Sequence, residues 1–268
     1  MEKLLNILLL NKLKNKKGGG GTTEPYEWNY LGYNTKVDDT LDPFQYSWNV
    51  LQNWNKATTN ADAFFRENNN LVYLPKLDMT NVTSARGFLR QCTNLKSIPA
   101  ITTPNVTDMY CFCFLDTTLE NVELFDTSKV LNFQYMFGGC SKLAEIPLFD
   151  TSSASTINSM VSGTKIETVP SFNTPNVEDM GYMCDGCSEL VNFPVLDVTK
   201  VTSMVYMFRD CSKLSDTSLN NILDMCAHTT SALTMQKKLS NLYLSGAQIN
   251  RCQLLSNWSQ AQANGWTV

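Results

Sequence analysis

Apolar residues recur along this chain in columns with a period of 24 residues. One column is the valine that follows a pair of hydroxyl residues: Val82, Val106, Val130, Ala154, Val177 and Val201. Two further columns keep the same register: Phe64, Phe88, Phe112, Met136, Met160, Met183 and Met207, and Leu71, Leu95, Leu119, Leu143, Ile166, Leu190 and Leu214. Every column shortens by one residue between Met160 and Ile166. A deletion shared by all later columns indicates homologous repeat units, because chance similarity would not preserve the register.

Each unit has a pattern that predicts two short elements. In residues 103–112, Thr103 is a candidate helix N-cap, and Pro104 suits the first helical position. Val106, Met109 and Phe112 then fall at i, i+3 and i+6, which is one face of a short helix or 3₁₀ turn. After a small-residue turn, a Leu-x-x-Ile-Pro run predicts an extended segment that ends at the proline, because proline has no N–H to donate to a ladder.

The fold class follows from the stacking that such units need. One unit of about 24 residues cannot bury its apolar face, whereas stacked neighbours form one continuous core. Six clear units occupy residues 77–216, and a degenerate unit precedes them at 54–76. We predict an α/β repeat fold: a parallel solenoid of leucine-rich-repeat type, with six to seven units of 23–24 residues over 54–216.

Three segments precede the predicted solenoid. Residues 1–17 (MEKLLNILLLNKLKNKK) place lysines after an apolar run and predict a basic amphipathic anchor helix, with a frayed tail as the alternative. The candidate anchor residues are Leu4, Leu5, Ile7, Leu8, Leu9 and Leu13. Residues 18–22 form a Gly-rich linker. Residues 23–53 are rich in aromatic residues and predict an N-terminal cap, with an aromatic binding site as the alternative.

The repeat stops at Asp216, and residues 217–268 predict a C-terminal cap. The stretch DTSLNNILDMCAHTT has the pattern of a capped helix. The remainder of the segment predicts one or two further helices and a short terminal strand.

Composition and charge exclude several functional classes. Charged residues make up 17% of the chain and the net charge is −4, so the chain lacks the basic stripe that nucleic-acid binding needs. No run of about 20 apolar residues is present to cross a membrane. His228 is the only histidine, which removes His–His zinc pairs, and it lies far from any nucleophile motif. We expect no enzyme activity, no cofactor and no metal ion.

The cysteines follow the repeat. Cys184 and Cys187 form a C-x-x-C, which is the spacing of redox and zinc sites. The two residues belong to different columns, however: Cys92, Cys140, Cys187 and Cys211 in one, and Phe137, Cys184 and Phe208 in the other. We therefore predict buried structural cysteines. Because the sequence shows no signal peptide, we expect reduced thiols.

One column is rich in acidic residues: Asp78, Thr102, Asp126, Asp150, Asn173 and Asp197. Calcium binding is one interpretation, but carboxylates stacked about 5 Å apart repel, and each calcium ion requires six to eight oxygen ligands. We predict that these side chains make turn and cap hydrogen bonds instead.

Solenoids usually bind partners through side chains displayed along their sheet. The candidate positions, one per unit before the Ile/Val/Phe–Pro pair, are Tyr73, Ser97, Asn121, Glu145, Thr168 and Asn192. Simple solvation of these polar residues is the alternative interpretation.

The unit FDTSKV…MFGGCSKL…IPLFD, and its equivalents over residues 71–216, resembles the BspA-type leucine-rich repeats of bacterial surface proteins. The units at 101–124 and 149–171 are degenerate: the first lacks the proline, and both lack the cysteine. The resemblance implies a right-handed solenoid and a role in adhesion and recognition, without catalytic residues. Similar repeats occur in tail and fibre proteins of bacteriophages.

Two functions follow as expectations from this resemblance and from the anchor segment. The first is a virion-associated structural and adhesion protein, which docks on other virion proteins through residues 1–17 and presents the solenoid to a host surface protein or glycan. The second is a BspA-type adhesin on the bacterial cell surface. A structural spacer is the third function and an enzyme a distant fourth. The expected partners also include further copies of the chain in a homo-oligomer.

Overall fold

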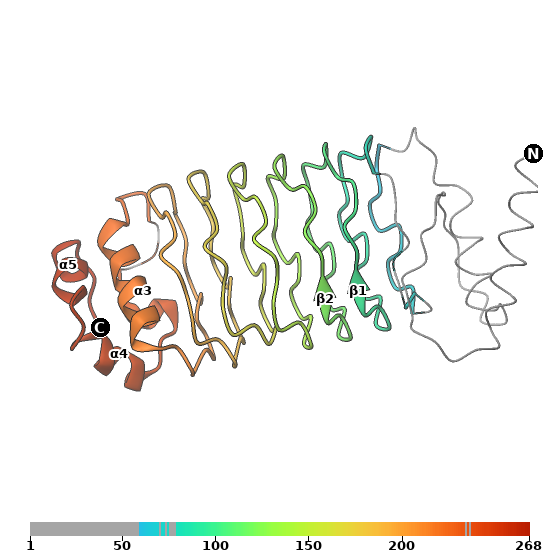
Figure 1. The fold of residues 1–268 in the computed structure, drawn as a ribbon. Coiled ribbons are helices and arrows are strands. Elements are labelled where there is room, and N and C mark those ends of the chain that lie inside the picture. The colour runs from blue at the N-terminus through green and yellow to red at the C-terminus, as the bar shows by residue number, and fades with distance from the viewer. Residues whose placement is uncertain (1–58, 70, 73, 75–78, 234, 236) are drawn as a thin grey trace, which may run out of the picture.

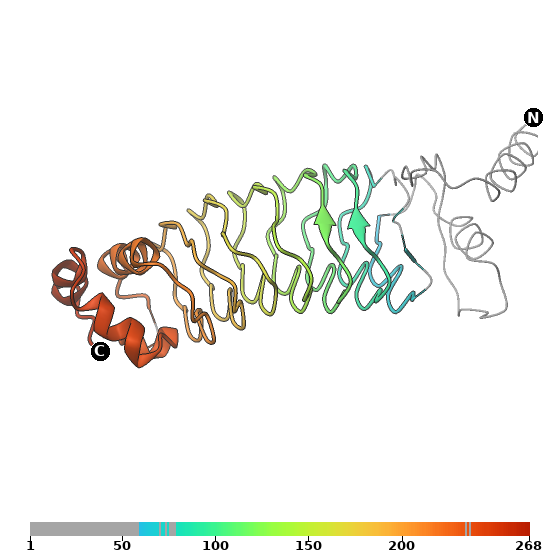
Figure 2. The same cartoon turned by 60° about the horizontal axis from the view of Figure 1, so that its bottom comes forward.

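The structure is a computed structural model that describes residues 59–268 except 70, 73, 75–78, 234 and 236. The predicted anchor, linker and aromatic cap, together with Tyr73, lie outside the described residues. From residue 59 onward the backbone winds into a row of coils, and helices cover its C-terminal end (Figures 1 and 2).

Parallel backbone pairing joins each coil to the next. One continuous column of parallel bridges runs through Asn60, Ser84, Asp108, Asn132, Thr156, Asp179 and Ser203. Each step has the length of one repeat unit, and the step from Thr156 to Asp179 is one residue shorter than the others. The shorter step contains the place where the apolar columns lose one residue, so the sequence columns and the backbone register coincide.

In each coil a segment of turns, here called the turn segment, follows the bridge residue. Successive N–H groups of this segment donate alternately to a carbonyl of the next coil and to a carbonyl of their own coil. Met109 and Cys111 donate across to the carbonyls of Asn132 and Gln134 in the next coil, at 3.0 and 2.8 Å. Phe112 follows Cys111, and its N–H donates back to the carbonyl of Met109, also at 3.0 Å, before Cys113 again donates to the next coil. The segment is therefore a run of four-residue turns closed by bonds from residue i+3 to residue i, which are the bonds of the 3₁₀ turn predicted as one alternative. The other alternative, a short α-helix, is wrong, because half of the donors serve the neighbouring coil instead of the i−4 carbonyl.

Two residues in every coil have left-handed backbone conformations, with φ between +53° and +76°. The first column is Ala63, Gly87, Cys111, Tyr135, Ser159, Tyr182 and Tyr206, and the second is Glu67, Gln91, Leu115, Gly139, Gly163, Gly186 and Asp210. A positive φ at the third residue of a turn is the requirement of type II geometry. It costs a residue with a Cβ atom roughly 1–2 kcal/mol, and the bonds between coils hold the backbone in this conformation.

The threonine predicted as a helix N-cap has a different role. Thr103 donates its Oγ1–H to the carbonyl of Asp126 in the next coil, at 2.6 Å. Thr127, Thr151 and Thr174 repeat this bond at 2.9, 2.7 and 2.9 Å. These hydroxyls therefore lie buried between coils and join them.

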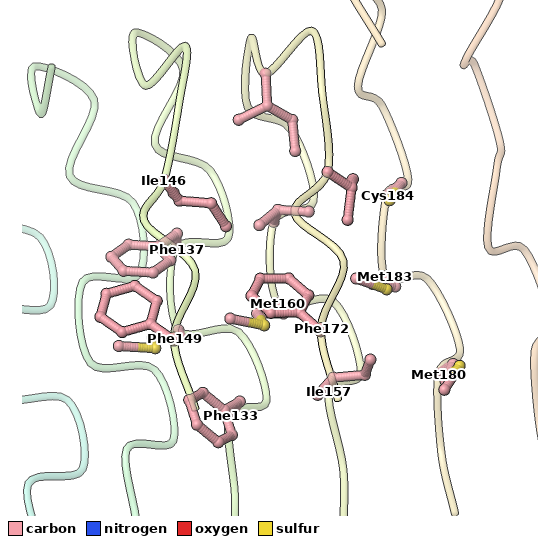
Figure 3. Close-up of a cluster of buried hydrophobic side chains, with 14 of the residues drawn as sticks. Phe133, Phe137, Ile146, Phe149, Ile157, Met160, Phe172, Met180, Met183 and Cys184 are labelled. Carbon is pink, nitrogen blue, oxygen red and sulfur yellow. The ribbon is translucent and has the colours of Figure 1, made fainter. Parts of the chain in front are cut away.

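The core is the shared interior of the coils. Residues of the three apolar columns are at most 3% exposed, apart from the partly buried Phe64. Figure 3 shows side chains from three successive coils pointing into this interior: Phe133, Phe137 and Phe149, then Ile157, Met160 and Phe172, then Met180, Met183 and Cys184. Because each coil covers the apolar residues of its neighbours, no coil has a core of its own.

Regular strands are short on the side of the Leu-x-x-Ile-Pro runs. Strands β1 (Ser97–Ile98) and β2 (Asn121–Val122) pair in parallel, with Ser97 opposite Asn121. An isolated bridge also joins Thr168 and Asn192. In the described part of the chain this pairing is not continuous. The unbroken column of bridges, from Asn60 to Ser203, lies instead next to the turn segments, on the side of the coils called the turn side. The proline column accounts for the difference, since proline offers no N–H to a neighbouring strand.

Helices close the C-terminal end: α3 (Asp216–His228), the 3₁₀ helix η2 (Leu239–Leu242), α4 (Gly246–Cys252) and α5 (Trp258–Ala263). Ser215 caps α3, which occupies the segment predicted as a capped helix, and a capping box of Ser245 and Gln248 starts α4. Tyr206 and Phe208 of the last coil donate their N–H groups to the carbonyls of Asn241 and Leu242. The carbonyls of η2 thus accept the N–H groups of the last coil, as the carbonyls of a further coil would do.

We expect Gly139→Ala to lower the free energy of unfolding by roughly 1–3 kcal/mol. Gly139 has φ +76°, and an added Cβ would lie 2.6 Å from Leu115 Cδ2 and 3.4 Å from its Cα. Urea unfolding followed by circular dichroism measures the loss. Gly246→Ala is the matched control, because nothing lies within 4 Å of its added Cβ. An equal loss in both variants would contradict the role of left-handed turns.

Candidate functional site

The predicted display positions form a row along the strand side, which is the side of the coils that carries β1 and β2. Four of the five described ones are exposed (Asn121, Glu145, Thr168 and Asn192), and Ser97 is partly buried. Asn192 donates its Nδ2–H to Thr168 Oγ1 at 3.1 Å, so neighbouring coils bring these side chains together. The row offers amide, hydroxyl and carboxylate groups to a partner. The one ionisable side chain among its described members, Glu145, is exposed.

An exposed apolar column follows three residues after the display row. Leu124, Leu148 and Val195 are 56%, 58% and 46% exposed, and Ala100 and Ser171 occupy the same column. This column was not predicted from the sequence, although it directly follows the column of prolines, in which Glu123 stands before Leu124. Exposed apolar side chains in line favour contact with another surface.

The acidic column makes turns, as predicted. Asp126, Asp150 and Asp197 each accept the N–H of the residue two positions later, at 2.9 Å. The hydroxyls of Ser128 and Thr199 also donate to Asp126 and Asp197 and hold the pKa of both carboxyls below its usual value. Within the described ranges, no three His, Cys, Asp or Glu residues are grouped to hold a metal ion.

A second surface row consists of tyrosine rings on the turn side. Tyr182 and Tyr206 stack with their centroids 5.0 Å apart, and Tyr206 lies 4.9 Å from Tyr243. The guanidinium of Arg209 lies 5.8 Å from the first ring and 5.7 Å from the second. Arg209 also donates from Nε to Asp185 Oδ1 at 2.6 Å, and a second bond joins Nη2 to Oδ2. The arginine charge is therefore neutralised inside the row.

The turn side carries a second aromatic group nearer the N-terminus. Tyr135 makes edge contacts with Phe114 and Tyr110, at centroid distances of 5.2 and 6.3 Å. Arg86 lies over Tyr110 and pairs with Asp108 at 2.9 Å. Neither group was predicted from the sequence, because Tyr135, Tyr182 and Tyr206 lie one residue before a buried apolar column and not in it.

The cysteines occupy buried packing positions. All nine are free and buried. Cys140, Cys187 and Cys211 donate from Sγ to carbonyls of the preceding coil at 3.0–3.1 Å, as their shared column implies. Cys184 packs in the core, and burial raises the pKa of its thiol. Cys187 is also a buried packing position, but a hydrogen bond from Cys184 lowers the pKa of its thiol. Because a raised pKa disfavours the thiolate, Cys184 is a poor nucleophile.

His228 lies exposed on the last turn of α3. Its Nδ1 is 2.7 Å from the carbonyl of Asp224 and 3.7 Å from a carboxylate oxygen of the same residue. Both contacts are within one helix turn. The described contacts of the ring therefore lie within α3 and include no nucleophile.

Asp116 is a fully buried carboxyl in the cysteine column. Its Oδ1 accepts the N–H of Cys92 at 2.6 Å, and its Oδ2 is buried without a hydrogen-bond partner. Burial raises its pKa to about 8, against an ordinary value of 3.8. The side chain is consequently protonated in the folded protein near neutral pH, where the unfolded chain is ionised.

We expect Asp116→Asn to gain stability over the parent as pH rises. A carboxyl whose pKa is raised by folding stabilises the fold fully below pH 4, and this contribution is lost as pH rises toward 8. The difference between the variant and the parent should widen by up to about 1.4 kcal/mol per pH unit in that window. Urea unfolding between pH 4 and 9 measures it.

Asp126→Asn is the control with the opposite sign. The pKa of Asp126 is lowered by Ser128, so its contribution is present at neutral pH and is lost as pH falls through the folded value. A stability difference between Asp116→Asn and the parent that stays constant from pH 4 to 9 would show that Asp116 is not protonated in the fold.

None of the described helices is long and apolar enough to span a bilayer. In comparisons with known proteins, the chain matches the family described as Mycoplasma protein of unknown function, DUF285, at residues 58–169, 105–222 and 149–249. Successive matches begin roughly two repeat units apart, as an internal repeat produces. No curated protein matches the chain, and no solved structure matches it. Because the matched ranges cover more than half of the 268 residues, the chain belongs to the DUF285 family of Mycoplasma proteins of unknown function.

Proposed function

We propose that this chain is a non-enzymatic binding protein that presents rows of surface side chains to a partner. The observation that carries the proposal is the alignment of equivalent exposed residues along the coils. The exposed display residues Asn121, Glu145, Thr168 and Asn192 occupy equivalent positions in successive coils, and Leu124, Leu148 and Val195 follow beside them. An elongated repeat surface of this kind suits recognition of an extended partner.

The leucine-rich-repeat class is part of this proposal. Parallel bridges that recur once in every repeat unit, together with the shared apolar interior, support a solenoid of that class. The right-handed sense follows from the resemblance to BspA-type repeats.

The proposed setting is the surface of a virion. The leucine-rich segment at residues 1–17 would attach the chain to other virion structural proteins, through Leu4, Leu5, Ile7, Leu8, Leu9 and Leu13. The Gly-rich linker would then leave the repeat region free to meet a host surface protein or glycan.

A bacterial cell-surface adhesin of BspA type is the second candidate. It is favoured by the description of the matched family, which names a bacterial genus. The same repeat surface would serve binding in either setting, so the two candidates differ in the object to which the N-terminal segment attaches.

We expect the full chain with Leu5, Leu8 and Leu9 changed to serine to lose association with purified particles. The substitutions remove apolar side chains from the anchor segment and leave the repeat intact. Co-sedimentation with particles, followed by immunoblotting, measures the loss. Replacing Lys12, Lys14 and Lys16 by glutamine is the matched control for charge. Undiminished association of the leucine variant would overturn the anchor role, and association with bacterial cells alone would favour the adhesin.

The display row is tested with Asn121→Arg, Thr168→Arg and Asn192→Arg combined in one chain. Bulky charged side chains in this row should weaken binding to isolated host envelopes about tenfold or more, because a few central contacts dominate an interface. Thr117→Arg, an exposed position outside the row, is the control. Equal binding by both variants would show that another face of the coils makes the contact.

A further inference from the structure

The exposed apolar column on the strand side presents side chains that water solvates poorly. Leu124, Leu148 and Val195 are 56%, 58% and 46% exposed. The partly buried Pro147 and Pro194 directly precede two of them and widen the apolar surface. Apolar side chains aligned in this way favour burial against another apolar surface.

Carboxylates lie on both edges of this column. The segments that carry the column and its edges are residues 97–102, 121–126, 145–150, 168–173 and 192–197. They contain no lysine or arginine, and their acidic residues, all exposed, are Glu123, Asp126, Glu145, Asp150 and Asp197. Glu123 and Glu145 precede the apolar residue of their coil, whereas the three aspartates follow it by two residues. Charge of one sign therefore borders the column on each side.

These carboxylates can accept further donors. The turn bonds of Asp126, Asp150 and Asp197 all go to Oδ1, so Oδ2 of each aspartate can accept another hydrogen bond. Glu123 accepts the N–H of Ala100 through Oε2 at 3.0 Å. Among the described residues, no ion pair involves any of the edge carboxylates. The two edges thus favour a partner with positive charge.

An apolar column between two acidic edges matches an amphipathic helix with lysines beside its apolar face. Residues 1–17 of this chain have that composition, with Glu2 as their one acidic residue. Their apolar side chains include the candidate anchor residues, and their basic residues are Lys3, Lys12, Lys14, Lys16 and Lys17. The segment therefore complements the column in both apolar character and charge.

The lengths of the two apolar faces also match. Leu124 and Val195 are three coils apart, which corresponds to about 14 Å at the usual strand spacing. In the helix that the sequence predicts for residues 1–17, Leu5, Leu9 and Leu13 fall at i, i+4 and i+8 on one face. That face would be about 12 Å long, at 1.5 Å per residue.

The segment can reach the column of its own chain. Residues 18–58 connect it to the first described coil, and about 40 residues can span more than ~100 Å when extended. Binding within one chain has an effective concentration on the order of millimolar, which a second copy in dilute solution does not reach. The connection therefore favours docking within one chain over docking between two copies.

We propose that residues 1–17 dock on the exposed apolar column of their own chain, with their leucines against Leu124, Leu148 and Val195 and their lysines beside the edge carboxylates. This docking goes beyond the proposed function and requires neither a virion nor a host surface. The docked segment lies next to the display row. Attachment of the segment to another object uncovers the column and the row beside it.

The test is carbodiimide cross-linking of the full chain, mapped by mass spectrometry. The reagent joins a lysine directly to a carboxylate that it contacts, so links between residues 1–17 and the edge carboxylates are expected. Leu124→Ser and Leu148→Ser combined in one chain should lower the yield of these links about tenfold, because the variant keeps every lysine and carboxylate but loses two apolar contacts. Leu254→Ser changes an 87% exposed leucine of the C-terminal cap and should leave the yield unchanged.

Three results would contradict the docking. They are no links between residues 1–17 and the edge carboxylates, an equal yield from the parent and the Leu124/Leu148 variant, and links that join isotope-labelled to unlabelled chains in a mixed sample. If the double variant does not fold, the full chain with Leu5, Leu8 and Leu9 changed to serine decides, since it should lose the same links with its repeat unchanged. Binding to particles or envelopes without any such links refutes the docking alone, whereas links without such binding refute the proposed function alone.

Discussion

This structure depends on one constraint: in the turn segments, successive backbone N–H groups donate alternately within a coil and to the next coil. One donor closes a turn within its own coil, and the next donates to a carbonyl of the following coil, as Cys111 does to Gln134. This alternation sets the spacing of the coils and keeps two residues per coil at positive φ. It also places equivalent side chains in columns, so the apolar interior and every surface row follow from one backbone pattern.

The sequence revealed the period and the buried columns because burial selects apolar residues at fixed intervals. It could not reveal the local conformation. Val106, Met109 and Phe112 are buried as predicted, yet a run of turns gives the same three-residue spacing as a short helix. The left-handed positions carry Cys111, Tyr135 and other residues with a Cβ, so glycine did not mark them. Long-range bonds, which local propensity does not report, determined the outcome.

The surface was predictable only in part. The display row was inferred from its polar character before each proline, and the described members lie in line. The tyrosine row was missed because stacking between coils depends on the period and not on the hydrophobic pattern. Asp116 stood in the cysteine column as a visible exception, but only its burial shows that it is held as a neutral acid. The leucine-rich-repeat class and both cellular settings stay predictions.

Hydrogen exchange at the residues of one exposed column tests the central claim most directly. Thr107, Leu131 and Thr202 have side chains at or near the surface, but their N–H groups donate to the preceding coil at 2.8, 2.8 and 2.7 Å. If the bonds between coils hold the fold, these amides will exchange as slowly as that of the buried Met136. Fast exchange in this column, with slow exchange confined to buried residues, would contradict the account.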